Sequence, residues 1–165
     1  MASPTSPDLF DLTGRTALIT GGSRGLGKEM ALAFARQGAE IMIASRSIES
    51  CRETAAEVFQ ETGRRCIPYA CHVGRWDELE GLADAVWNEF EGLDILVNNA
   101  ATNPYYGQTL GVDSARFDKT FQVNLKGPLF WSQAVWNASM KTKPGVILNI
   151  ASVGGLRSEQ GLGVY

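Results

Sequence analysis

The 165-residue sequence has a single histidine, three cysteines and no long apolar run, and each scarcity excludes a class of protein. One histidine, His72, cannot form a metal site by itself, so no metal site is expected. Cys51, Cys66 and Cys71 form no Cys-x-x-Cys pair and are odd in number, which is typical of reduced thiols in a reducing compartment. No apolar stretch approaches the ~20 residues that span a bilayer.

Positive charge is not in excess either, because 15 Lys and Arg residues face 18 Asp and Glu residues, giving a net charge of −3. This balance argues against nucleic acid or an anionic membrane as a partner. The first seven residues lack the apolar core of a secretory signal, so we expect a cytoplasmic protein. At 44% hydrophobic residues, the chain is expected to form one domain over 12–165, preceded by a short tail over 1–11.

Apolar strands and amphipathic helical stretches alternate strictly along the chain. The expected strands are 15–20, 40–45, 65–73, 93–98 and 146–151, and the longest helical stretch runs from about 113 to 140. In the first helical stretch, Leu26, Met30 and Phe34 recur every four residues and are expected to be buried. Such alternation predicts a parallel sheet with helices on both faces. We expect an α/β, doubly wound Rossmann fold with strand order 3-2-1-4-5.

The first strand is followed by Thr20-Gly21-Gly22-Ser23-Arg24-Gly25-Leu26-Gly27, which opens a helix. A strand, glycine-rich turn and helix point backbone N–H groups and a positive helix end at a phosphate. An early glycine permits φ values that other residues avoid, and a middle one lets a pyrophosphate approach. The last removes a side chain where helix meets strand. The spacing is GxxxGxG rather than GxGxxG, and alone it also fits a plain turn.

Unusual residue clusters fall where each expected strand ends. They are Gly21–Gly27 after the first strand, Ser45 and Arg46 after the second, His72 and Val73 after the third, Asn98–Ala101 after the fourth and Ser152 after the fifth. In an open parallel sheet, ligands bind beyond the carboxyl ends of the strands, where the strand order reverses. The five clusters together indicate one ligand-binding edge.

From about Leu12 to its last residue, the chain closely resembles the short-chain dehydrogenase/reductase family. Thr20-Gly21-x-x-x-Gly25-x-Gly27 matches the family's cofactor loop, and Asn98-Asn99-Ala100-Ala101 resembles its Asn-Asn-Ala-Gly motif, with alanine in the glycine place. Asn124 matches the helix asparagine, and Ser152 and Tyr165 match the catalytic serine and tyrosine. Within the family, the run 98–104 is similar to gluconate 5-dehydrogenases and some carbonyl reductases.

The resemblance implies hydride transfer between a nicotinamide cofactor and a small-molecule carbonyl or alcohol. Tyr165 would be the acid or base, Ser152 would hydrogen-bond the substrate oxygen, and Asn124 would hold a water in the proton relay. Taken singly, these residues also fit a terminal tyrosine, a strand-end cap and a polar residue that kinks a helix. The implied cofactor contacts are Gly21, Ser23, Arg24, Gly25, Leu26, Gly27, Ser45, Arg46, His72, Val73, Asn99 and Ala100, while Asn98 is expected to brace the sheet.

Charge at these positions favours NADP(H) over NAD(H). An NAD-preferring site places an acid after the second strand, where it would repel a 2′-phosphate, but this sequence has Ser45 and Arg46 there. Arg24 adds a second guanidinium, and both offer forked donors to a phosphate. The alternative is that both arginines are merely solvated. His72 stands where the family usually has an aspartate near the adenine, and it equally fits a histidine that caps backbone.

The family's motif is Tyr-x-x-x-Lys, and the sequence reaches only its tyrosine. We therefore expect an N-terminal fragment of an oxidoreductase, with little activity alone, whose longer parent is a homo-oligomer. The alternative is a non-catalytic NADP-binding module. The fifth strand has the composition of one buried on both faces, yet no further strand follows to pair its outer edge. Such an edge is a template for aggregation, so poor solubility of the chain alone is expected.

Overall fold

The computed structural model describes residues 9–75, 77–157 and 159–165, so most of the expected tail lies outside the described residues. Five strands form one parallel sheet of order β3-β2-β1-β4-β5, which confirms the predicted doubly wound topology. They are β1 (Thr16–Thr20), β2 (Glu40–Ser45), β3 (Cys66–Ala70), β4 (Ile95–Asn98) and β5 (Val146–Asn149). The order reverses between β1 and β4, where such sheets bind ligands.

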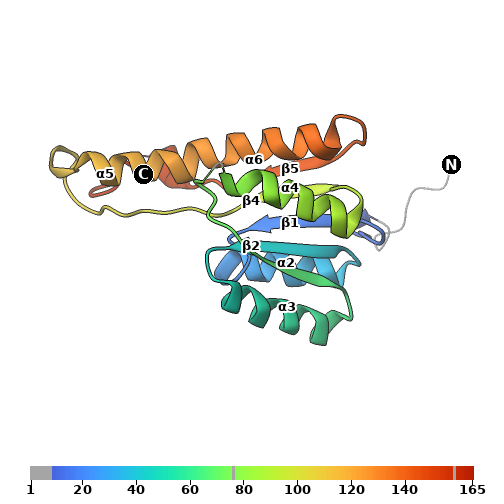
Figure 1. Ribbon diagram of the computed structural model, residues 1–165. Coiled ribbons are helices and arrows are strands. Elements are labelled where there is room, and N and C mark those ends of the chain that lie inside the picture. The colour runs from blue at the N-terminus through green and yellow to red at the C-terminus, as the bar shows by residue number, and fades with distance from the viewer. Residues whose placement is uncertain (1–8, 76, 158) are drawn as a thin grey trace.

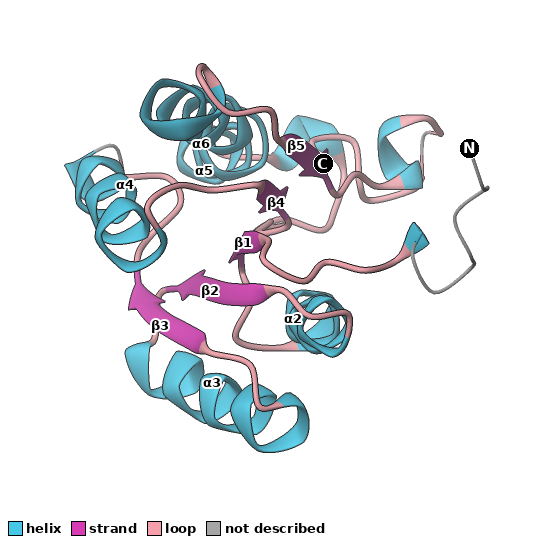
Figure 2. Ribbon diagram, turned by 90° about the vertical axis from the view of Figure 1, so that its right-hand side faces the viewer, coloured by secondary structure: helices cyan, strands magenta, loops and turns pink. Residues whose placement is uncertain are grey.

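Helices cover the two faces of the sheet, as Figures 1 and 2 show. On one face lie α2 (Gly25–Arg36) and α3 (Ile48–Thr62). On the other lie α4 (Asp77–Phe90), α5 (Ser114–Phe121) and α6 (Gly127–Val135). The π-helical turns η2 (Gln122–Lys126) and η3 (Trp136–Met140) join and extend α5 and α6, which confirms one long helical stretch over 114–140. Two 3₁₀ turns, η1 (Thr109–Gly111) and η4 (Val153–Gly155), lie in the connections.

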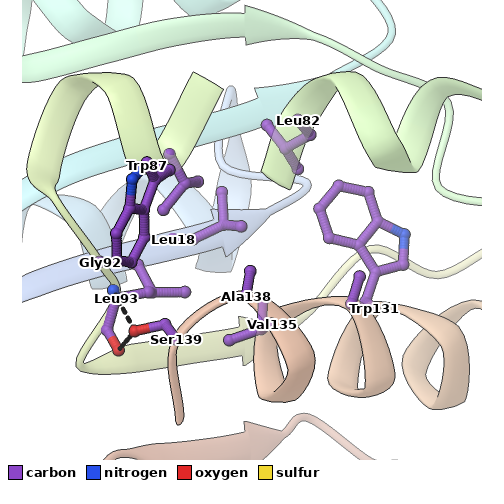
Figure 3. A pocket seen from close by; sticks show the side chains of 11 residues that line it. Leu18, Leu82, Trp87, Gly92, Leu93, Trp131, Val135, Ala138 and Ser139 are labelled. Carbon is purple, nitrogen blue, oxygen red and sulfur yellow. Dashed lines mark hydrogen bonds between the residues drawn. The ribbon is translucent and has the colours of Figure 1, made fainter. Parts of the chain in front are cut away.

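Each face of the sheet has its own buried cluster, because neighbouring side chains on a strand point to opposite faces. Ile19 and Ile43 pack beneath α2 and α3, whereas Leu18 and Trp131 belong to the cluster beneath α4 and α6. The second cluster borders a small, partly open cavity of about 20 Å³ whose lining is mostly apolar (Figure 3). Both faces of the central strand β1 are therefore buried, as its continuous apolar run predicts.

The expected burial of Leu26 is wrong. Its side chain is 70% exposed, and α2 instead buries Gly27, Ala31 and Ala35, together with Leu32. The glycine and the two alanines recur every four residues, so they form a face of small residues. That face lets the helix lie close against the sheet, which the larger side chains would prevent.

All strands but β2 are shorter than expected, since β1 begins at Thr16 rather than 15, β4 begins at Ile95 rather than 93, and β5 ends at Asn149 rather than 151. β3 is shorter than the predicted 65–73, and it contains Pro68, which is tolerated because β3 lies at an edge of the sheet. The expectation that β5 is buried on both faces is wrong. Ile147 packs into the cluster beneath α4 and α6, but Val146 and Leu148 point to the opposite face and are 61% and 41% exposed. No described helix covers that face of β5.

Candidate cofactor-binding site

A cleft of about 770 Å³ lies beyond the carboxyl ends of β1, β2, β3 and β4. Ten of the twelve predicted cofactor residues line it: Gly21, Ser23, Arg24, Gly25, Ser45, Arg46, His72, Val73, Asn99 and Ala100. Leu26 and Gly27 do not line the cleft, since Leu26 points to solvent and Gly27 is buried beneath the loop. The sheet topology thus brings together residues that are far apart in the sequence.

The glycines of the loop have separate steric roles. Gly21 has a φ of +65°, and a Cβ there would lie 3.0 Å from the Cα of Ala100. Gly27 abuts the carbonyl of Gly21 and has no room for a Cβ. Gly25 has a φ of +55° and nothing within 4 Å of its Cβ position, so its backbone is open to the cleft. Gly22, which the sequence did not single out, would place a Cβ 2.6 Å from the Cγ2 of Ile43.

The loop after β4 is held by a buried threonine at the end of β1. The Oγ1 of Thr20 accepts hydrogen bonds from the backbone N–H groups of Asn99 (3.0 Å) and Ala100 (3.1 Å). The side-chain amide of Asn99 donates in return to the carbonyl oxygens of Thr20 (2.9 Å) and Gly21 (3.3 Å). These bonds fix the glycine loop and the β4 loop as one wall of the cleft.

Asn98 points away from that wall and braces the sheet, as the sequence suggested. Its amide donates to the Oδ1 of Asn149 on the neighbouring strand β5 at 2.8 Å. It also donates to the hydroxyl of Ser132 at 3.2 Å, which ties α6 to the sheet.

The charged residues that line the cleft are all cationic. Arg24 and Arg46 are exposed, and neither guanidinium has an ion-pair or hydrogen-bond partner within the described ranges. Lys119 of α5 also lines the cleft, whereas none of the aspartates and glutamates that the structure describes does. The cleft therefore suits a ligand that carries several negative charges.

His72 shows the backbone-capping role that the sequence left open. Its Nδ1 accepts a hydrogen bond from the backbone N–H of Gly74 at 3.0 Å, and its Nε2 lies 2.8 Å from the Nζ of Lys119. The backbone N–H of His72 donates to the carboxylate of Glu78 at 2.6 Å. Burial lowers the pKa of His72, and the ammonium of Lys119 lowers it further.

The three predicted catalytic residues do not line the cleft. Asn124 lies in η2 and binds the backbone of Thr102, a lining residue, through both ends of its amide at 2.8 Å. The Oγ of Ser152 accepts the backbone N–H of Gly154 at 3.1 Å. The Ser152 Oγ and the ring of Tyr165 lie 3.3 and 3.4 Å from the point where Gly154 would carry a Cβ. The structure thus places Ser152 beside Tyr165.

Six residues that line the cleft were not predicted from the sequence: Ser47, Ser50, Cys71, Thr102, Lys119 and Val123. Ala101, which belongs to the predicted cluster after the fourth strand but not to the predicted cofactor contacts, lines the cleft as well. Lys119 and Val123 are four apart, so they share one face of the helical stretch. Burial raises the pKa of Cys71 to about 12, and nearby Glu78 contributes to the rise, so this thiol remains protonated.

The family of this chain follows from comparison with known proteins. The family model for short chain dehydrogenase matches residues 15–165. The chain belongs to the short-chain dehydrogenase family. It is 36% identical to the sorbitol dehydrogenase of Cereibacter sphaeroides over 93% of this chain and 59% of that protein. The chain thus spans about three fifths of the length of the curated relatives it matches.

Two solved structures similar to this chain share its fold and hold a nicotinamide cofactor or its analogue. The alcohol dehydrogenase of Thermococcus sibiricus, complexed with 5-hydroxy-NADP, has a TM-score of 0.86 and 29% identity over 92% of this chain and 63% of that one. An NAD⁺-bound xylitol dehydrogenase has a TM-score of 0.88 and 26% identity over 93% and 59% of the two chains. Oxidoreductases similar to this chain therefore bind either phosphorylated or unphosphorylated dinucleotides.

Within the ranges the structure describes, no helix has both the length and the apolar character needed to cross a membrane.

Proposed function

We propose that the protein to which this chain belongs transfers hydride between NADP(H) and a carbonyl or alcohol group of a small-molecule substrate. The observation that carries this proposal is the charge of the cleft, where Arg24, Arg46 and Lys119 converge without a lining carboxylate. An acid after β2 would favour NAD by repelling a 2′-phosphate, and Arg46 stands there instead. The family membership supports the reaction class, and the cations support the phosphorylated cofactor.

The residues of the cleft fit a dinucleotide. The open backbone of Gly25 at the start of α2 leaves room for a pyrophosphate against backbone N–H groups. The unpaired guanidiniums of Arg24 and Arg46 would hold the 2′-phosphate, since each offers several donors in a fixed plane. Asn99 and Ala100 would contact the cofactor on the β4 side, and Ser23, Ser45, His72 and Val73 would complete its binding surface.

When bound, the nicotinamide supplies or accepts the hydride. Tyr165 donates a proton to the alkoxide that forms during carbonyl reduction, or removes one in the reverse direction. Ser152 hydrogen-bonds the same oxygen from its position beside Tyr165. Asn124 uses one donor and one lone pair on Thr102, which leaves its second donor and second lone pair to hold a water.

We propose further that the 165-residue chain alone binds cofactor but turns over little substrate. The lysine that completes the family's Tyr-x-x-x-Lys motif is not among its residues. A parent protein that is a homo-oligomer is supported by an exposed apolar row on the long helix, formed by Phe117, Phe121, Leu125 and Leu129. The three free, buried cysteines support a cytoplasmic location.

Fluorescence titration of the chain with NADPH and NADH tests the cofactor proposal. We expect NADPH to bind at least tenfold more tightly, because only NADPH carries the 2′-phosphate. Equal or tighter binding of NADH would overturn the preference.

A non-catalytic NADP-binding module remains a second candidate, because the catalytic residues lie outside the cleft lining while the cofactor residues form it. Substitution of Tyr165→Phe in the longer protein separates the two. A loss of carbonyl reduction with unchanged NADPH binding supports the enzyme, since the substitution removes only the proton-bearing hydroxyl. Unchanged reduction would exclude the proposed role of Tyr165.

A further inference from the structure

Lys119 and His72 are in direct contact in the lining of the cleft. The imidazole of His72 cannot accept a hydrogen bond from both Lys119 and the backbone N–H of Gly74. The backbone N–H of Gly74 donates to Nδ1 at 3.0 Å, while the Nζ of Lys119 lies 2.8 Å from Nε2. A neutral imidazole has one N–H and one lone pair, and an ammonium has donors only. If Nδ1 accepts from Gly74, then Nε2 bears the hydrogen and faces another donor.

The other protonation states do not resolve this conflict. A hydrogen on Nδ1 would let Nε2 accept from Lys119, but it would break the bond from Gly74. A doubly protonated ring would present donors to both partners, and burial together with nearby Lys119 lowers the pKa of His72 away from that state. The ammonium of Lys119 therefore lies against a ring that cannot accept hydrogen bonds from Lys119 and from Gly74 at the same time.

No described carboxylate forms an ion pair with the ammonium of Lys119. Glu78, the acid nearest to the ring in the hydrogen-bond network, uses one oxygen on the backbone N–H of His72 and the other on Arg75. Asp118, the sequence neighbour of Lys119, is exposed and accepts from Ser114. The half-buried ammonium thus has no ion-pair partner among the described residues, and it lies in the wall of a cleft already lined by Arg24 and Arg46.

We propose that Lys119 is a phosphate-binding residue of the cleft, and that its ammonium leaves His72 to pair with a phosphate of the bound nucleotide. This inference rests on the proposed cofactor and adds a third cation, from α5, to the two arginines. The four-carbon stem of lysine lets the ammonium move between the two positions. Departure of Lys119 frees Nε2 of His72 to donate to the ligand while Nδ1 keeps its bond from Gly74.

The test measures dissociation constants of NADPH, adenosine 2′,5′-bisphosphate, 5′-AMP and adenosine for the full chain and its variants. We expect Lys119→Gln to weaken NADPH about tenfold, since a charge-assisted hydrogen bond at a half-buried site is lost. Adenosine, which has no phosphate, should change less than twofold. If Lys119→Gln loses affinity for the bisphosphate but not for 5′-AMP, Lys119 binds the 2′-phosphate. If it loses affinity for both ligands, Lys119 binds the 5′-phosphate. Either result supports the proposal.

Two variants control for indirect effects. Lys119→Arg keeps the charge and should keep NADPH affinity within about threefold, since guanidinium also binds phosphate. Lys141→Gln removes a matched exposed lysine at the other end of the long helical stretch and should leave affinity unchanged. If Lys119→Gln weakened the binding of adenosine and of NADPH by the same factor, the effect would be structural and the proposal would be overturned.

The single histidine gives an independent readout. Because His72 is the only histidine in the chain, its ring ¹⁵N resonances need no assignment to a residue, and only Nδ1 and Nε2 have to be distinguished. Addition of the bisphosphate should shift the Nε2 resonance in the wild-type chain and shift it less in Lys119→Gln. If the wild-type chain binds NADPH with a phosphate preference but neither readout depends on Lys119, this inference alone fails. If NADPH does not bind at all, the proposed function fails as well.

Discussion

The hydroxyl of Thr20 lies between β1 and the loop after β4, where it accepts the backbone N–H of Ala100 at 3.1 Å. The same oxygen accepts the N–H of Asn99 and donates to the carbonyl of Val97, so one buried side chain joins three backbone groups. This wall of the cofactor cleft therefore depends on a single hydroxyl.

Replacement of Thr20 by valine keeps its shape and removes that hydroxyl. We expect Thr20→Val to lower the free energy of unfolding by about 2 kcal/mol, because two part-buried backbone N–H groups lose their acceptor. NADPH affinity should fall too, since the positions of Asn99 and Ala100 depend on these bonds. Thr20→Ser retains the oxygen and serves as the control in thermal unfolding and titration. The explanation fails if the valine variant is as stable as the serine variant.

Substitution of two loop glycines by alanine should affect stability at one position and NADPH affinity at the other. Gly22→Ala places its Cβ 2.6 Å from the Cγ2 of Ile43, so a loss of about 2 kcal/mol of stability is expected from overpacking. Gly25→Ala meets no protein atom within 4 Å and costs only about 1 kcal/mol for its positive φ. The methyl group of Gly25→Ala instead lies where a phosphate would approach the backbone of residue 25. NADPH affinity should therefore fall more in Gly25→Ala than in Gly22→Ala. Urea unfolding and NADPH titration of both variants measure the two effects.

Arg46→Asp should reverse the cofactor preference. The substitution replaces a guanidinium with a carboxylate directly after β2, which repels a 2′-phosphate and can accept from ribose hydroxyls. We expect NADPH affinity to fall tenfold or more and NADH affinity to rise. Arg52→Asp makes the same charge change on an exposed residue that does not line the cleft, and it controls for net charge. An equal loss of NADPH affinity in Arg46→Asp and Arg52→Asp would indicate a long-range effect of net charge and not a contact made by Arg46.

Asp94 should make stability depend on pH in the acid range. Burial opposes ionisation of this carboxylate, but hydrogen bonds from Thr16, Lys143 and Arg15 outweigh it and lower the pKa of Asp94. A lowered folded-state pKa stabilises the protein above the unfolded value of about 3.9. That stability is lost as pH falls through the folded-state pKa.

Asp94→Asn removes the charge and should cost about 3 kcal/mol at pH 7, because charged hydrogen bonds at a buried site are broken. Its free energy of unfolding should vary less than that of the wild type as pH falls below about 4. Asp84→Asn, on the exposed side of α4, is the matched control and should leave the acid limb unchanged. Chemical unfolding across this pH range checks both expectations.

The apolar cavity beneath α4 and α6 should accept one more methylene group. Val135 lines this cavity of about 20 Å³, as Figure 3 shows. We expect Val135→Ile to raise the unfolding free energy by up to about 0.8 kcal/mol, the value of one buried methylene. Val146→Ile adds the same group at a position that is 61% exposed, so little change is expected there. A destabilised Val135→Ile protein would mean that the cavity cannot take the new rotamer.

The sheet order could be predicted from the sequence because strict alternation and right-handed crossovers leave few topologies. The exposure of Leu26 could not, since periodicity gives weight to large side chains. The buried residues of α2 include Gly27, Ala31 and Ala35, whose small size lets the helix approach the sheet. The exposed face of β5 was missed because composition does not show which faces receive a helix.

The cofactor residues could be predicted wherever they follow a strand, because parallel strands bring their carboxyl ends to one edge. Lys119 lies within a helix, and its place in the cleft depends on how α5 lies against the loop after β3. That relationship is tertiary, so local sequence carried no sign of it. The need for glycine at Gly22 likewise arises from Ile43 of the neighbouring strand β2.

The wall formed by Thr20, Asn99 and Gly21 is assembled by internal hydrogen bonds alone. A preorganised wall spares the dinucleotide much of the entropic cost of ordering a binding loop. The amide protons of Asn99 and Ala100 should consequently exchange slowly with solvent even in the ligand-free protein, and cofactor should gain little further protection for them. Capture of cofactor would then depend on the cationic side chains that line the cleft rather than on rearrangement of the backbone.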